Sequence, residues 1–254
     1  MRVRAVFSAG ILALGCATAG LATASPAAAV ANGSDVPQGQ YEFAAKLTLT
    51  GVPQPGGGTY GSVCSGSLVA PKWVLTTGHC FHDVNHNRVA GPVPYPTTAT
   101  LGTSDQTAKP GETRKVTQVL QAGPNDVALA ELDQPVTGIT PLTVNRAIPA
   151  AGQRLTLAGW GSLTAVNPKP STKLQQGVVE VGQVWPTTVG VHGVSPANTT
   201  SACAYDSGAP YFLPSGAGGQ LVAVESNGPD CPHSGLETAA RVDLIADWIT
   251  SHIG

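Results

Sequence analysis

Short runs of β-forming residues, separated by Gly, Pro, Asn and Asp, recur along this chain and constrain its fold more than any other feature. The clearest runs lie at residues 45–50, 67–69, 73–76, 116–121, 128–132, 154–159, 178–181 and 221–225. Many short strands punctuated by turn residues are typical of an antiparallel barrel or sandwich, so we predict an all-β fold. We expect one amphipathic helix at residues 241–253, where apolar residues recur at helical spacing. The Gly- and Pro-rich segments 51–61 and 91–96 are expected to be surface loops.

The first 29 residues have a composition of their own. Two arginines precede an apolar run diluted by Gly, Ser and Thr, and small residues lead to three alanines at 27–29. This order is typical of a secretory signal peptide with an A-x-A cleavage site, and a membrane anchor is the less favoured alternative. Cleavage there would release Val30, whereas earlier cleavage would release Ser25. We therefore expect a signal peptide at 1–29 and a secreted, extracellular protein with no stable membrane association.

The net charge and the spacing of the histidines indicate which kinds of ligand the protein is not expected to bind. The formal net charge is −2 and there is no basic patch, so we expect no nucleic acid partner. No spacing among the histidines predicts a metal site, and we expect neither a metal nor another cofactor. We also expect a monomer. Five histidines are expected in solvated loops: His82, His86, His192, His233 and His252.

Four cysteines remain once the predicted leader is removed: Cys64, Cys80, Cys203 and Cys231. An even number of cysteines in an exported chain favours two disulfides. Three pairings are possible. Proximity in the sequence favours Cys64 with Cys80 and Cys203 with Cys231.

Three short segments contain the residue types of a hydrolytic triad. His79 follows a β-rich run and precedes Cys80, Asp126 opens the apolar run 127–132, and Ser207 lies in a Gly-containing turn. A serine hydroxyl needs a base within hydrogen-bond distance, and the base needs a carboxylate to orient it. Histidine suits the base because its pKa lies near neutral pH. The order His, Asp, Ser matches one known arrangement, so we predict His79, Asp126 and Ser207 as catalytic residues.

Six segments carry a resemblance to a known family: Val-Ala-Asn-Gly at 30–33, Cys-Ser-Gly-Ser-Leu at 64–68, Thr-Thr-Gly-His-Cys at 76–80, Asn-Asp-Val-Ala-Leu at 125–129, Ala-Gly-Trp-Gly at 158–161 and Asp-Ser-Gly-Ala-Pro at 206–210. Together they resemble the trypsin/chymotrypsin-like serine proteases, in particular secreted bacterial members, over nearly all of residues 30–254. The resemblance implies two six-stranded antiparallel β-barrels with a boundary near residue 145, the triad in the cleft between them, and a C-terminal helix. It also implies both disulfides favoured above.

The same resemblance assigns further site residues. The backbone N–H groups of Tyr205 and Ser207 would form the oxyanion hole. Ser226 and Gly228 would bind the backbone of the substrate. Ser201 would lie at the bottom of the primary specificity pocket.

Three positions depart from the family's usual pattern. The family usually has Gly at Tyr205, Gly at Ala209 and Trp at Asn227. We expect Tyr205 either to keep a strained backbone conformation or to follow a flipped peptide that removes one oxyanion donor. Its ring is expected to crowd the leaving-group side. Both arrangements predict a slow protease that favours small substrates over folded proteins.

Two pairs of residues carry further expectations from the resemblance. The new α-amino group of Val30 would form an ion pair with Asp206, so export alone would yield active enzyme. Glu225 and Glu237 would lie near the walls of the primary pocket. We expect both carboxylates to point elsewhere or to pair with Arg241, which leaves a preference for large apolar or small side chains.

The sequence therefore predicts a secreted serine endopeptidase that hydrolyses peptide bonds through an acyl-enzyme intermediate, slowed by Tyr205. Its expected partner is a peptide or protein substrate. The alternatives are a catalytically silent protein that binds peptides or proteins through the same cleft, and an esterase on the same scaffold.

Overall fold

The computed structural model describes Met1 and residues 30–254. The predicted signal peptide and its cleavage site at 27–29 lie outside the described residues. Within the described residues, no helix has the length and apolar character needed to cross a membrane.

The first sheet closes on itself as a ring of six strands. Its order is β7-β6-β2-β3-β4-β8, and β8 pairs back to β7. Its members are β2 (Ala44–Pro53), β3 (Thr59–Ala70), β4 (Trp73–Thr76), β6 (Thr97–Leu101), β7 (Glu112–Gln121) and β8 (Ala128–Leu132). The two-residue strand β5 (Gly91–Pro92) adds to the edge of β7. A single turn of 3-10 helix, η1 (Gly78–Cys80), follows β4.

The second sheet forms a similar ring. Its order is β11-β10-β13-β14-β15-β12, and β12 pairs back to β11. Its members are β10 (Arg154–Gly159), β11 (Gln175–Val184), β12 (Thr188–Ser195), β13 (Pro210–Ser215), β14 (Gly218–Asn227) and β15 (Glu237–Arg241). Two-residue strands join it from outside: β1 (Ser34–Asp35) pairs with β11, and β9 (Thr143–Val144) runs parallel to β14.

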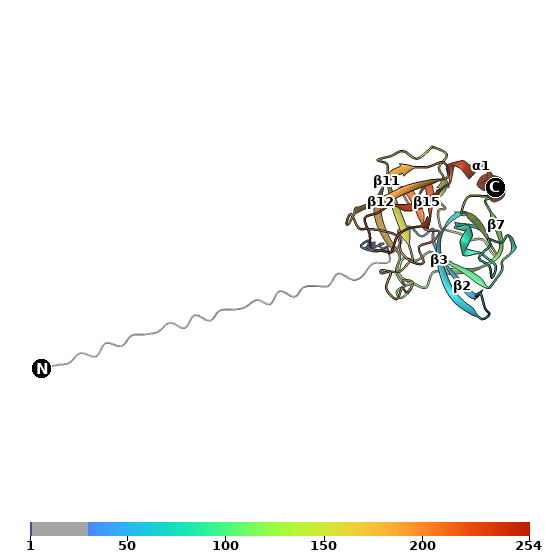
Figure 1. Cartoon of the computed structure of the whole chain (residues 1–254), viewed down its shortest axis with the longest axis horizontal. Coiled ribbons are helices and arrows are strands. Elements are labelled where there is room, and N and C mark those ends of the chain that lie inside the picture. The colour runs from blue at the N-terminus through green and yellow to red at the C-terminus, as the bar shows by residue number, and fades with distance from the viewer. Residues whose placement is uncertain (2–29) are drawn as a thin grey trace.

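Figure 1 shows these two barrels beside each other, with the short C-terminal helix α1 (Ala246–Ile253) at their edge. The predicted all-β class, with two antiparallel barrels and a terminal helix, is confirmed. The helix begins later than predicted, because Ala240 and Arg241 are held in the sheet by β12 and β14. A 3-10 turn, η2 (Asp243–Ile245), then leads into α1.

All the strands expected from the sequence are present, but the first expected loop is shorter than predicted. The segment 51–61 was expected to be a loop, yet β2 continues to Pro53 and β3 begins at Thr59. A shift in register between Leu49 and Val52 lets the β2–β3 hairpin continue past Gly51. Four ring strands had no sequence prediction: β6, β12, β13 and β15.

Aromatic packing ties the two barrels together. Phe212 of β13 meets Phe43 edge-on, with ring centroids 5.1 Å apart, and meets Tyr41 at 4.9 Å. All three rings are buried in one core cluster that also includes residues of α1. Edge-to-face pairs of this kind add about 0.5–1.5 kcal/mol each beyond the area they bury. These contacts pack the two barrels directly against each other.

Both disulfides have the pairing favoured by proximity in the sequence. Cys64 of β3 bonds to Cys80 at the end of η1, and Cys203 bonds to Cys231. The first fixes the turn after β4, and the second fixes the loop that precedes β13. Two disulfides fit an oxidising compartment.

Candidate active site

His79 and Asp126 meet because β4 and β8 are antiparallel neighbours. Thr76 at the end of β4 lies opposite Ala128 at the start of β8, so the residues beyond each end converge. The ring nitrogen Nδ1 of His79 lies 2.7 Å from Asp126 Oδ2. The backbone N–H of His79 donates to Asp126 Oδ1 at 2.9 Å. One carboxylate therefore fixes both the main chain and the ring of the histidine.

Two further residues surround the Asp126 carboxylate. The hydroxyl of Ser226 donates to Oδ2 at 2.7 Å, and Arg88 Nη1 lies 3.9 Å from Oδ1. Burial raises the pKa of Asp126, but the hydrogen bonds and charge of His79, with the Ser226 hydroxyl, outweigh it and lower that pKa overall. Ser226 is expected from the resemblance to bind substrate, but neither its bond to Asp126 nor the position of Arg88 was predicted. Arg88 lies in a polar loop with no pattern that predicts this contact.

Ser207 lies opposite this pair, in the loop between Cys203 and β13. Its carbonyl accepts a hydrogen bond from the N–H of Ser65 at 2.8 Å, which attaches the loop to β3 of the other barrel. Ser207, His79 and Tyr205 all line one cavity of about 260 Å³. The structure thus brings together the three residues predicted to form a triad, with His79 and Ser207 on a shared cavity.

Tyr205 has a backbone conformation that usually belongs to glycine. Its φ is +77°, in the left-handed region that costs a non-glycine residue about 1–3 kcal/mol. The preceding carbonyl, that of Ala204, accepts the N–H of Ser162 at 2.7 Å, and the Tyr205 carbonyl accepts the Ser65 hydroxyl at 3.2 Å. The Ala204 carbonyl is therefore turned away from the cavity. Of the two arrangements expected for Tyr205, the structure has the strained one and not the flipped peptide.

The backbone around Ser207 leaves two N–H groups available. Asp206 donates its N–H to Cys203, Gly208 to Glu225 and Ala209 to Asp206. In the part of the chain that the structure describes, the N–H groups of Tyr205 and Ser207 have no such acceptor. Stabilising an oxyanion requires backbone donors of this kind, beside the serine and without an acceptor of their own.

Asp206 is fully buried beneath this loop. Its carboxylate accepts the N–H groups of Gly161 at 2.8 Å and Cys203 at 3.0 Å. Burial nevertheless raises its pKa well above the ordinary value, and among the described residues no cationic side chain pairs with it. Val30 is also fully buried, and the adjacent Ala31 pairs with Ser201.

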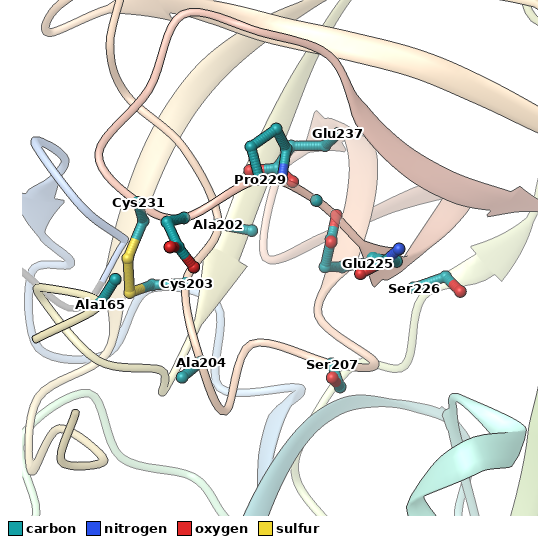
Figure 2. A pocket seen from close by; sticks show the side chains of 13 residues that line it. Ala165, Ala202, Cys203, Ala204, Ser207, Glu225, Ser226, Pro229, Cys231 and Glu237 are labelled. Carbon is teal, nitrogen blue, oxygen red and sulfur yellow. A yellow bond between two sulfur atoms is a disulfide. The ribbon is translucent and has the colours of Figure 1, made fainter. Parts of the chain in front are cut away.

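A second cavity, of about 250 Å³, opens on the other side of Ser207 (Figure 2). Ser226 and Gly228 line it, as do Glu225 and Glu237. The expectation that the two glutamates point elsewhere is therefore wrong.

The residues around the second cavity also differ from expectation. Arg241 pairs with Asp243, at 3.0 and 2.6 Å, rather than with either glutamate. Ser201, expected at the bottom of this pocket, is buried, and its hydroxyl accepts the N–H of His233 at 3.3 Å. His233 was expected to be solvated, yet its ring lies 2.9 Å from Glu237.

Comparison with known proteins decides the family. The family model described as Trypsin matches residues 30–249. The chain belongs to the trypsin-like serine protease family.

Three relatives of this trypsin-like chain have similar sequence identities but differ in how much of their own length the match covers. Glucanase inhibitor protein 2 of Phytophthora sojae is 29% identical and covers 98% of this chain and 87% of that protein. Suppressor of tumorigenicity 14 protein homolog of Bos taurus is 28% identical, over 89% of this chain but 28% of that protein. Chymotrypsin-like elastase family member 3B of Homo sapiens is 26% identical, over 89% and 91%.

A solved structure supports the same fold for this trypsin-like chain. Neuropsin, a serine protease expressed in the limbic system of mouse brain, superposes with a TM-score of 0.70 at 20% identity. The match covers 89% of this chain and 100% of that one. The relatives named here are eukaryotic, and membership of a secreted bacterial branch stays a prediction.

Proposed function

We propose that this protein is a secreted serine endopeptidase. The observation that carries the proposal is that His79, whose ring is paired with Asp126, lines one cavity with Ser207 and Tyr205. A base, an orienting carboxylate, a hydroxyl and two oxyanion donors are what acyl transfer to a serine requires. The signal-like leader and the two disulfides support export to an oxidising compartment.

The proposed reaction has two halves. Ser207 Oγ attacks the carbonyl carbon of the scissile peptide bond while His79 Nε2 takes the hydroxyl proton. Asp126 holds the ring in the tautomer with Nδ1–H and stabilises the imidazolium. The carbon–nitrogen bond then breaks, and His79 returns the proton to the departing amine. Water attacks the acyl-enzyme by the same route, which releases the carboxylic acid and restores Ser207.

Maturation is proposed to complete this site. Removal of residues 1–29 would give Val30 a free α-amino group, which we propose inserts beside the buried Asp206. An ammonium group there would supply the cation that the carboxylate lacks among the described side chains. The mature protein is proposed to act as a monomer on peptides or proteins, with Ser226 and Gly228 contacting the substrate backbone.

Labelling with a fluorophosphonate probe tests the proposed nucleophile. The mature chain should label stoichiometrically, and Ser207→Ala should abolish labelling. Ser251→Ala, on the exposed face of α1, is the matched control and should label like the wild type. A wild-type chain that fails to label, while remaining folded, would count against the proposal.

A second candidate function is a catalytically silent protein that binds peptides or other proteins through the same cleft. Two observations favour it: the strained Tyr205 at the position where the family usually has Gly, and the similarity to a relative named as a glucanase inhibitor protein. A chain that binds peptides but leaves the fluorophosphonate probe unreacted would support this candidate instead.

A further inference from the structure

Two buried carboxyl groups occupy the pocket that adjoins Ser207. Glu225 is 4% exposed and Glu237 is 2% exposed, yet both line the same 250 Å³ cavity. In Figure 2 their side chains enter the pocket from the adjacent strands β14 and β15. One water occupies roughly 30 Å³ in the liquid, so a cavity of about 250 Å³ could hold about eight waters. That volume is sufficient for one long side chain. Burial of two acidic groups at one site is costly unless something binds to them.

Gly228 gives the Glu237 carboxyl its position at the pocket wall. A β-carbon built at Gly228 would collide with Glu237 Oε2. The glycine therefore lets the carboxyl group turn into the pocket rather than away from it. A larger residue at this position would displace Glu237.

The neighbours of the two carboxyl groups would compensate little of the negative charge that the groups carry when they ionise. Glu225 Oε2 accepts the hydroxyl of Tyr211 at 2.6 Å, and Glu237 Oε1 lies 2.9 Å from His233 Nε2. Neither neighbour is a permanent cation. Asp206 raises the pKa of Glu237 further in this chain, and in the mature protein the proposed Val30 ammonium would pair with Asp206 itself.

The outer groups add no permanent cation either. Asp230 lines the mouth of the same cavity and adds a further carboxylate. Arg241, which the sequence offered as a partner for these glutamates, is paired with Asp243 instead.

The electrostatics of the pocket follow from this arrangement. Burial raises the pKa of Glu225 to about 8, and burial together with the charges of Glu225 and Asp206 raises the pKa of Glu237 to about 9. Burial also lowers the pKa of His233, so this ring is a weak source of positive charge above neutral pH. An incoming cation would favour the ionised carboxylates and displace a proton from the pair.

Building on the proposed endopeptidase function, we propose that this pocket binds the lysine or arginine side chain of a peptide substrate through the carboxyl groups of Glu225 and Glu237. Cleavage would follow the residue that supplies this side chain, because the pocket opens beside Ser207. Substrate binding would release about one proton, so the preference for cationic over neutral side chains rises with pH. This replaces the preference for apolar or small residues that Ser201 suggested from the sequence.

Kinetics with matched esters test the preference. Arginine and citrulline esters have nearly the same shape and differ in charge, so the ratio of their kcat/KM values cancels any pH effect that both substrates share. We expect this ratio to exceed about tenfold near pH 8 and to fall by about tenfold for each pH unit below that. Glu237→Gln and Glu225→Gln should each lower the ratio near pH 8 by about tenfold or more. Glu180→Gln is the control, because Glu180 pairs with Arg154 on the outside of the barrel and should leave the ratio unchanged.

Binding measurements separate this inference from the catalytic proposal. Calorimetry of the mature chain with butylguanidinium and with the neutral butylurea needs no turnover. We expect the guanidinium to bind more tightly, with proton release and with a Kd that falls about tenfold per pH unit between about pH 6 and 8. Guanidinium binding without fluorophosphonate labelling would overturn the catalytic proposal and keep this one. Labelled Ser207 with equal affinity for the two probes, or with a citrulline preference at both pH values, would overturn this inference and keep the catalytic proposal.

Discussion

The Ser226 hydroxyl donates a hydrogen bond, 2.7 Å long, to Asp126 Oδ2, the carboxylate oxygen that also binds the His79 ring. A hydrogen bond to a charged group typically contributes about 1.5–3 kcal/mol. We expect Ser226→Ala to lower kcat/KM for a peptide ester by about ten- to a hundredfold, because Asp126 then holds the ring less firmly. Ser226→Thr retains the hydroxyl and should keep most of the activity. An equal loss in both variants would mean that the hydroxyl is not responsible.

Tyr205 permits a test that separates backbone strain from crowding by the ring. Tyr205→Gly should raise the free energy of unfolding by roughly 1 kcal/mol, whereas Tyr205→Ala keeps the β-carbon and should gain little. Both variants should cleave a folded protein substrate about tenfold faster, because the ring that lines the His79 cavity is gone. Since the peptide before Tyr205 is not flipped, rates on a small ester should change by less than about threefold. A gain of about tenfold on the ester for Gly alone would show instead that the oxyanion hole is impaired.

Glu237 should make the stability of the fold depend on pH. Its pKa is raised to about 9 in the folded chain, so the folded state retains a proton that the unfolded chain releases from about pH 4.5 upward. The stability that Glu237 contributes is therefore complete below the unfolded pKa and is lost as pH rises toward about 9. In urea unfolding, the free energy of unfolding of Glu237→Gln should rise relative to that of the wild type between about pH 5 and 8. Glu180→Gln, on the outside of the same barrel, should show no such gain, and a constant difference for Glu237→Gln would contradict the raised pKa.

The first residue of the mature chain should control activity through Asp206. A buried carboxylate without its partner typically costs about 3–5 kcal/mol, so a chain that begins at Val30 should label with fluorophosphonate at least about a hundredfold faster than one that begins at Ser25. Asp206→Asn should remove this difference by slowing the Val30 chain. N-terminal sequencing of the labelled protein identifies the active form. Fully active material that begins at Ser25 would exclude the ion pair.

The sequence predicted most of the fold because turn residues and β-rich runs mark strand positions locally. Three of the four strands that were missed have a local physical reason. β12 carries Gly190 and Gly193, where the Trp185 ring and the backbone of Thr200 approach too closely for a side chain. β13 begins with proline, and β15 contains two alanines, which have weak β propensity. Closure of each ring depends on pairing between distant strands, which local patterns do not specify.

Part of the candidate site was also predictable from local patterns. His79, Asp126 and Ser207 each lie in a short segment of recognisable chemistry, so the sequence alone identified them as candidates. The direction of the Glu225 and Glu237 side chains depends on the register of β14 with β15 and on the space left by Gly228. No local pattern specifies such a register, and the sequence therefore favoured the wrong arrangement.

The pairing of β1 with β11 has a consequence for how the protein is made. Asn32 donates to the hydroxyl of Thr199, which lies 167 positions further along the chain, and Ala31 pairs with Ser201. The ribosome makes residues 30–35 among the first of the described chain, and their docking partners at 175–176, 199 and 201 follow only much later. A chain that ended before these partners would have no place to bury its own beginning, and its amino end would stay open to aminopeptidases. Protection of the amino end therefore requires synthesis at least as far as residue 201.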